Sequence, residues 1–155
     1  MDTVPNAAFD ANFPLDVEFA HPAGCYLARK LQQSLPAVAS AVNDFDNWRD
    51  SGWVVTCDVG GQRFEVYFAG IGTESAPTTW MLGVAPVGQP GSIRRLFGAK
   101  VAPYETQSKA LTLHLHEFLL NDTHISNVRW AMNADPSESK VRDPSQLRWG
   151  GANVA

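Results

Sequence analysis

Alternating apolar and polar residues define a strand pair in the middle of the chain. Residues 53–59 and 62–69 flank Gly60-Gly61, a tight hairpin turn in which both central residues take positive φ. On one face this turn pairs Cys57 with Phe64, Val55 with Val66 and Trp53 with Phe68. On the other face it pairs Asp58 with Arg63, Thr56 with Glu65 and Val54 with Tyr67. The hairpin therefore belongs to a sheet with one buried, apolar face.

Apolar residues at helical spacing predict helices on both sides of this hairpin. One begins near Pro22, which a first helical turn tolerates, and runs to Ser34 before Pro36 ends or kinks it. A second short helical stretch, 37–42, is expected to follow. Another helix spans 104–120, directly after a proline. The buried stripes of the two longer helices consist of Leu27, Leu31 and Leu35, and of Leu111, Leu115, Phe118 and Leu119.

Two further strands are predicted over 79–87 and 125–132. In the first, Trp80, Leu82 and Val84 face inward, whereas Met81, Gly83 and Ala85 leave room for something to lie close to the other face. Residues 92–101 fit either a strand or a loop. Residues 1–20 fit either an edge strand or an arm packed onto the body, because their apolar positions are spaced mainly by two. The end of the chain is predicted to be loosely held, with Leu147 and Trp149 able to dock.

The order helix, three strands, helix and strand predicts an α+β fold. We expect a single domain with an antiparallel sheet of about four to five strands and helices packed on one face. The predicted division is an N-terminal arm over 1–20, a core domain over 21–132 and a polar C-terminal tail over 133–155. With 155 residues, 45% of them hydrophobic, the chain is large and apolar enough to bury a core of its own.

The net charge of −4 comes from the first third of the chain, where seven acidic and three basic side chains lie within 1–50, against nine of each in 51–155. An acidic domain without a basic stripe is poorly suited to nucleic acid or an anionic membrane, since both need Lys and Arg to neutralise phosphate. No apolar run approaches the roughly 18 residues of a membrane-spanning helix. The first twenty residues carry four acids and no base, unlike a signal peptide. Cytoplasmic localisation is therefore expected.

Motifs for catalysis or metal binding are weak in this chain. His114 and His116 are two apart on a predicted helix, so they point to different sides and cannot chelate one ion together. Cys25 and Cys57 lack the close-spaced partners of a zinc site and are expected as buried thiols, with one disulfide as the alternative. His21 lies four residues before Cys25, but the proline after it places it outside the helix, which argues against a thiolate–imidazole pair. We expect no metal, no cofactor and no catalytic residue.

The connector 44–52, before the hairpin, combines acidic and aromatic side chains in a way that favours recognition. Binding hot spots are enriched in Trp, Tyr and Arg. The predicted partner-binding residues are Asp44, Asp46, Trp48 and Asp50 of this connector and Tyr67 of the adjoining sheet. The structural alternative is that Phe45 and Trp48 only pin the connector to the sheet edge. Arg94, Arg95 and Lys100 form a basic cluster, which is either a solvated loop or a site for an anionic group or the acidic arm of a second copy.

These features predict a non-catalytic cytosolic protein-binding module that presents an acidic surface to a partner. Small bacterial proteins that neutralise a toxin (immunity proteins) or escort a secreted effector share this general profile of size and charge. The alternative is a small-ligand-binding protein or small enzyme with a pocket between sheet and helix, where Cys57, Glu65, Tyr67 and His114 supply the polar groups. A homodimer that uses a strand edge or the N-terminal arm is a third possibility.

Overall fold

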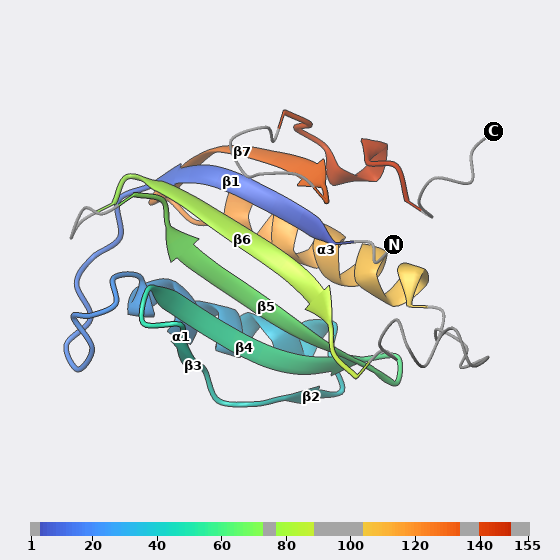
Figure 1. Cartoon of the computed structure of the whole chain (residues 1–155), viewed down its shortest axis with the longest axis horizontal. Helices are drawn as coiled ribbons and strands as arrows, with labels where there is room; N and C mark the ends of the chain where they lie inside the picture. The colour runs from blue at the N-terminus through green and yellow to red at the C-terminus, as the bar shows by residue number, and fades with distance from the viewer. Residues whose placement is uncertain (1–3, 73–76, 89–103, 134–139, 150–155) are drawn as a thin grey trace.

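The computed structural model describes residues 4–72, 77–88, 104–133 and 140–149. It is an α+β domain in which two α-helices pack against an antiparallel sheet of seven strands (Figure 1). The strands are β1 (Pro5–Ala11), β2 (Ala41–Val42), β3 (Asp46–Trp48), β4 (Gly52–Val59), β5 (Gln62–Gly70), β6 (Thr79–Pro86) and β7 (Ile125–Met132). The helices are α1 (Cys25–Ser34) and α3 (Glu105–Leu120), and the short 3-10 turns are η1 (Leu35–Ala37) and η3 (Pro144–Gln146). In the described residues, none of the helices has the length and apolarity needed to span a bilayer.

The β4–β5 hairpin confirms the predicted register in every pair. Gly60 and Gly61 take φ of 56° and 83°, as a two-residue turn of this kind requires. The predicted pair of opposite charges forms on the outer face, where Arg63 Nε lies 2.9 Å from the Asp58 carboxylate. The apolar partners Cys57, Val55 and Phe64 are buried on the inner face. Local alternation and turn chemistry were therefore sufficient to define this part of the sheet.

The sheet is larger than the four to five strands predicted. Its order is β2-β4-β5-β6-β1-β7, and β3 also pairs with β4, on the side away from β5. The segment expected as an edge strand or packed arm contains β1, an interior strand hydrogen-bonded to β6 and to β7. Pro5 is the first residue of β1, a position where a missing N–H is tolerated, and Ala7, Ala8 and Phe9 are fully buried. The division into arm, core and tail at the predicted boundaries stays a prediction.

Two helix predictions require correction. The stretch 37–42 is not helical: η1 contributes one turn, and Ala41 and Val42 then pair with β4. Residues 41 and 42 form a strand because the edge of β4 offers their backbone groups hydrogen-bond partners. A helix of only two turns is marginally stable by comparison. Helix α1 begins at Cys25, three residues after Pro22, since Gly24 takes φ of 98° and ends the preceding loop. The Trp80 ring approaches Gly24 so closely that a Cβ there would lie 2.7 Å from a ring carbon.

Leucines of the two helices and aromatic residues of the strands form the core. Both helices lie behind the sheet in Figure 1, and α1 contacts β4 while α3 contacts β4, β6 and β7. The predicted stripes are buried, except that Phe118 is only half-buried at the side of α3. Burial of each such leucine contributes roughly 1.5–3 kcal/mol, so this apolar layer is the main source of stability.

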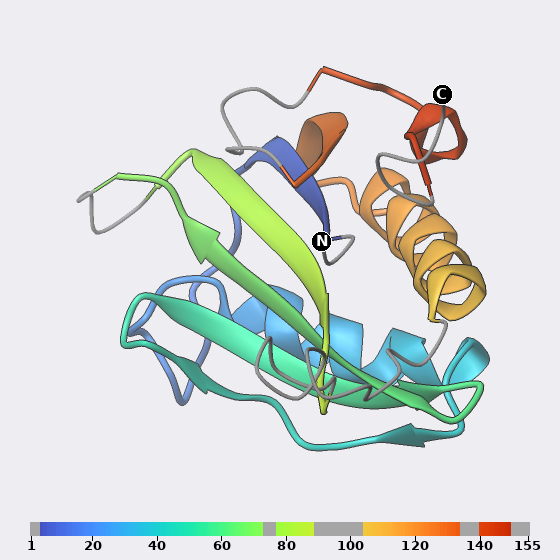
Figure 2. The ribbon, with the colours of Figure 1, turned by 45° about the vertical axis from the view of Figure 1, so that its right-hand side comes forward.

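The described part of the C-terminal tail docks on the domain. Val141 forms a β-bridge with Trp130 of β7, and η3 packs against α3, as the red segment beside that helix shows in Figure 2. Leu147 is buried and Trp149 is half-buried. The predicted strand or loop over 92–101, with its basic cluster of Arg94, Arg95 and Lys100, lies outside the described residues.

Candidate functional site

Trp48 and Tyr67, both predicted from the sequence, stack on the outer face of the sheet. Their ring centroids are 4.8 Å apart with an interplanar angle of 16°. Tyr67 in turn lies across Gly83, where an added Cβ would come within 2.2 Å of the phenol ring. This ring occupies the space that the small residues of β6 leave open. Burial raises the pKa of the Tyr67 hydroxyl, which therefore stays neutral.

The turn after Trp48 brings a second side chain, Arg49, into contact with that indole. Arg49 and Asp50 take φ of 52° and 57°, and the Ser51 N–H donates to the Trp48 carbonyl at 3.1 Å. The Asn47 side chain accepts a hydrogen bond from the Asp50 N–H at 2.8 Å, which stabilises this left-handed pair. The Arg49 guanidinium lies 5.1 Å from the Trp48 ring centroid, within cation–π range. Trp48 thus contacts both Arg49 and Tyr67 and is half-buried.

Asp44, Asp46 and Asp50 precede and follow Trp48 in the chain, and all three are exposed. Asp44 accepts a hydrogen bond from the Gln32 amide at 3.2 Å, and Asp46 accepts one from the Asn47 N–H at 2.7 Å. Across the described segments, no basic side chain forms an ion pair with any of the three. We call Asp44, Asp46, Trp48, Asp50 and Tyr67 the acidic edge. It combines an indole packed on Tyr67 with three negative charges that have no ion-pair partner among the described residues.

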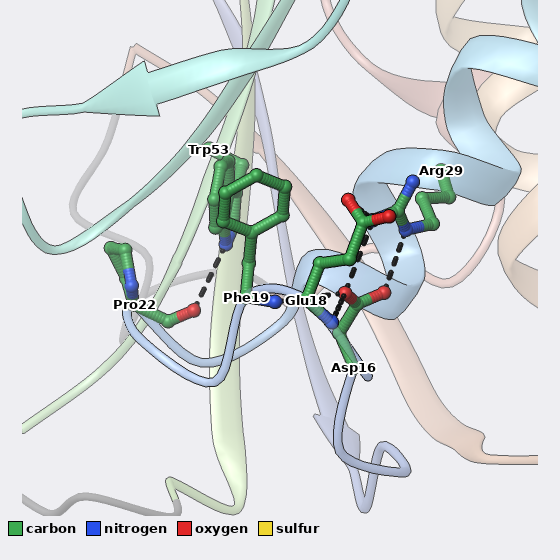
Figure 3. Close-up of polar contacts among 6 residues, drawn as sticks. All are labelled: Asp16, Glu18, Phe19, Pro22, Arg29 and Trp53. Carbon is green, nitrogen blue, oxygen red and sulfur yellow. Dashed lines mark hydrogen bonds and ion pairs between the residues drawn. The ribbon is translucent and has the colours of Figure 1, made fainter.

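The loop over 14–20 adjoins the acidic edge, and sequence analysis did not assign it to a site. Figure 3 shows how Arg29 of α1 holds it: Nε lies 2.7 Å from one Asp16 oxygen, and Nη2 lies 3.2 Å from Glu18. Phe19 joins Phe45 and Trp53 in an aromatic cluster with centroid separations of 5.5–6.3 Å. No pattern in the sequence links Asp16 to a residue on the following helix, so this contact could be identified only from the structure.

The aromatic cluster also supports the structural alternative for the connector. Phe45 packs on Trp53, and Trp48 packs on Tyr67, so both aromatic residues do pin the connector to the sheet edge. The two roles are compatible, because Trp48 keeps part of its surface open to solvent while Phe45 faces the cluster. A small cavity of about 70 Å³ lies under the 14–20 loop, lined by Phe13, Phe19 and Trp80 among others. It has room for a few water molecules only.

A second group of polar residues lies in a groove of about 360 Å³ between α1 and α3. The Ser34 hydroxyl and His114 Nε2 are hydrogen-bonded at 2.9 Å across it. The Lys30 ammonium lies 3.0 Å from Asp122, whose side chain is 1% exposed. Burial alone raises the pKa of the Asp122 carboxyl, but hydrogen bonds from the His124 N–H, Lys30 and the His124 ring outweigh it and leave that pKa below its usual range. We call this region the helix groove.

The remaining polar candidates are separated in the structure. Cys57 is on the buried face of β4, Glu65 and Tyr67 are on the outer face of β5, and His114 is in the helix groove. The four groups of the alternative ligand pocket therefore do not meet. His116 accepts a hydrogen bond from the Trp130 indole at 3.1 Å, away from His114.

The thiols are unsuited to nucleophilic chemistry. Cys25 and Cys57 are free and buried, and burial raises the pKa of each to about 11. His21, near Cys25 in sequence, is exposed. Within the ranges that the structure describes, no cluster of three or more His, Cys, Asp or Glu side chains is placed to hold a metal ion.

Comparison with protein-family models, with curated proteins and with solved structures finds no match to this chain. The acidic edge and the helix groove are therefore the two regions whose geometry bears on function.

Proposed function

We propose that this chain is a non-catalytic protein-binding module whose acidic edge meets a basic surface of a protein partner. Small bacterial proteins that neutralise a toxin or escort an effector work in this general way, and we place the chain in that class of function. The observation that carries the proposal is a short segment with three exposed aspartates, none of them ion-paired within the described residues, and an indole that contacts Tyr67 and Arg49. Cytoplasmic localisation is part of the same proposal.

The held indole supports a binding role because ordering a side chain is part of the cost of association. Trp48 already contacts Tyr67 and Arg49, so a partner that covers it needs to immobilise few additional bonds. Tryptophan is among the residues most enriched in hot spots.

The aspartates support the same role through electrostatics. Unpaired acids at an interface steer a basic partner and raise the association rate, and they disfavour partners with acidic or phosphate surfaces. A nucleic acid or an anionic membrane is therefore disfavoured as the ligand. A homodimer through this surface is disfavoured as well, because two acidic edges repel each other.

The helix groove favours a second candidate function, the binding or hydrolysis of a small ligand. The supporting observation is the Ser34–His114 hydrogen bond, which resembles a serine nucleophile beside its base. Among the described residues, however, no side chain accepts a hydrogen bond from the other ring nitrogen of His114 to orient it. A small ligand of this groove would raise the melting temperature of the isolated protein, whereas a binding module responds to its protein partner.

The test is affinity capture from the native cells with three tagged forms of the protein. Wild type should retain one stoichiometric protein with a basic surface, and Asp44→Asn/Asp46→Asn should retain much less of it. Glu105→Gln/Glu117→Gln removes two exposed acids from α3 and is the matched control, expected to match wild type. Equal capture by all three forms, or capture of no protein, would contradict the proposed function.

A further inference from the structure

The 14–20 loop exposes two aliphatic side chains beside the acidic edge. Leu15 is 84% exposed and Val17 is 102% exposed, although most of the large apolar residues described are in the core. Single exposed apolar residues are common on protein surfaces and need no special explanation. Two of them next to each other, on a loop that is held in place, indicate more than chance exposure.

The loop is held by the residues that alternate with these two. One Asp16 oxygen accepts hydrogen bonds from the Glu18 and Phe19 N–H groups at 2.9 and 3.0 Å, and the carboxylate also binds Arg29 (Figure 3). The hydrogen-bonded Arg29 guanidinium holds the pKa of Asp16 well below its usual range, so the contact persists at neutral pH. These contacts direct the Asp16 side chain toward the domain and tie the Glu18 carboxylate to Arg29. They leave Leu15 and Val17 in water without another apolar group to cover them.

The loop contacts the segment of the acidic edge through Phe19 and Phe45. Phe19 packs against Phe45 with ring centroids 6.3 Å apart, and the Arg29 guanidinium lies over both rings. Asp44 and Asp46 flank Phe45 in the chain, and the Glu18 side chain is 69% exposed on the loop. Acidic side chains therefore adjoin the two aliphatic residues in the chain, at Asp16 and Glu18, and the loop contacts the segment that carries Asp44 and Asp46.

We infer that Leu15 and Val17 are the apolar anchors of the binding surface and that the partner protein carries an apolar pocket bordered by Lys or Arg side chains. This inference rests on the proposed function. An aliphatic centre with a charged rim is the usual anatomy of a protein interface. The acidic border disfavours insertion into an anionic membrane, which would otherwise suit two exposed aliphatic side chains.

The experiment places a photo-crosslinking benzophenone amino acid at one position at a time in the full chain, expressed in its native cells. Position 17 tests the anchors, position 43 tests the acidic edge through exposed Asn43, and position 120 is the control through Leu120, 55% exposed on α3. The inference expects positions 17 and 43 to capture the same protein, and position 120 not to. The peptide attached to position 17 should combine aliphatic residues with nearby Lys or Arg.

The affinity for the captured protein then distinguishes a failure of the anchors, Leu15 and Val17, from a failure of the proposed function. Leu15→Ser/Val17→Ser should weaken binding at least tenfold, while the control Leu120→Ser changes it less than twofold. Capture from position 43 with no loss of affinity in the loop variant overturns the anchors and leaves the proposed function standing. Capture from neither 17 nor 43 overturns both. Attachment of position 17 to lipid, or to a second copy of this chain, also overturns the inference.

Discussion

The acidic edge and the helix groove both contain several charged side chains, but these differ in burial and in pairing. In the groove, Asp122 is 1% exposed and receives hydrogen bonds from Lys30 and His124. At the edge, Asp44, Asp46 and Asp50 are exposed, and within the described ranges no cation pairs with them. A compensated buried charge serves the fold, because its partner is already present. An uncompensated exposed charge costs the fold little and remains available to another molecule.

Loss of the groove cation should have the largest effect on stability. Lys30→Met leaves Asp122 buried without its ammonium partner, and we expect a loss of about 3 kcal/mol in the free energy of unfolding. Urea denaturation measures it. Lys109→Met, which removes an exposed lysine from α3, should change stability by less than about 0.5 kcal/mol. Equal effects of the two substitutions would show that the groove charges are not compensated as described.

A methyl group at Gly83 should disturb the support of the acidic edge. Gly83→Ala places a Cβ about 2.2 Å from the Tyr67 ring, so the ring must move and the Trp48 stack must loosen. We expect a loss of about 2 kcal/mol, with a change in near-ultraviolet circular dichroism. In Tyr67→Ala/Gly83→Ala the two effects should be far from additive, because removal of the ring removes the clash. Additive effects would contradict a clash between the new Cβ and the Tyr67 ring.

A low pH should remove the contribution of two paired carboxylates, Asp16 and Asp122, to the stability of the fold. Both have a folded-state pKa below the unfolded value of about 3.9, so their contribution is complete above that pH and is lost as the pH falls through the folded pKa. Stability should therefore fall below about pH 4, and Lys30→Met should show a shallower fall. Hydrogen exchange at the Glu18 and Phe19 amides reports on Asp16 directly. Equal protection of these amides at neutral pH in wild type and in Asp16→Ala would exclude the carboxylate as the anchor of the loop.

Neutralising the acidic edge should have the smallest effect on the isolated protein. For Asp44→Asn/Asp46→Asn/Asp50→Asn we expect a change within about 0.5 kcal/mol, in either direction, since none of these groups forms an ion pair within the described residues. Thermal and urea denaturation of the triple variant measure it. A loss of more than about 2 kcal/mol would mean that the aspartates stabilise the fold, and the contrast with the helix groove would disappear.

The sequence could predict the elements that depend on neighbouring residues, but not those that depend on residues far away in the chain. The β4–β5 register follows from two glycines and from alternation, so it needed no information from distant residues. Strands β2 and β3 have two and three residues, too short for any periodic pattern, and they form only because β4 offers a free edge. Strand β1 was assigned to the periphery because its neighbours in the sheet lie more than 60 residues away.

Candidate residues show the same dependence on sequence distance. Trp48 and the aspartates around it form one short segment, and composition alone singled them out. The contact of Asp16 with Arg29 spans 13 residues, and that of Lys30 with Asp122 spans 92. No local pattern relates such pairs, so the loop anchor and the helix groove emerged only from the folded chain.

The most direct test of the central claim is the dissociation constant for the captured partner. Two double variants should be compared with wild type: Asp46→Ala/Trp48→Ala at the acidic edge and Glu117→Ala/Leu120→Ala at exposed positions of α3. Each removes one acid and one large apolar side chain. We expect the edge variant to weaken binding by more than about 2 kcal/mol, roughly thirtyfold, and the α3 variant to bind like wild type. Unchanged affinity in the edge variant would contradict the claim that this surface binds the partner.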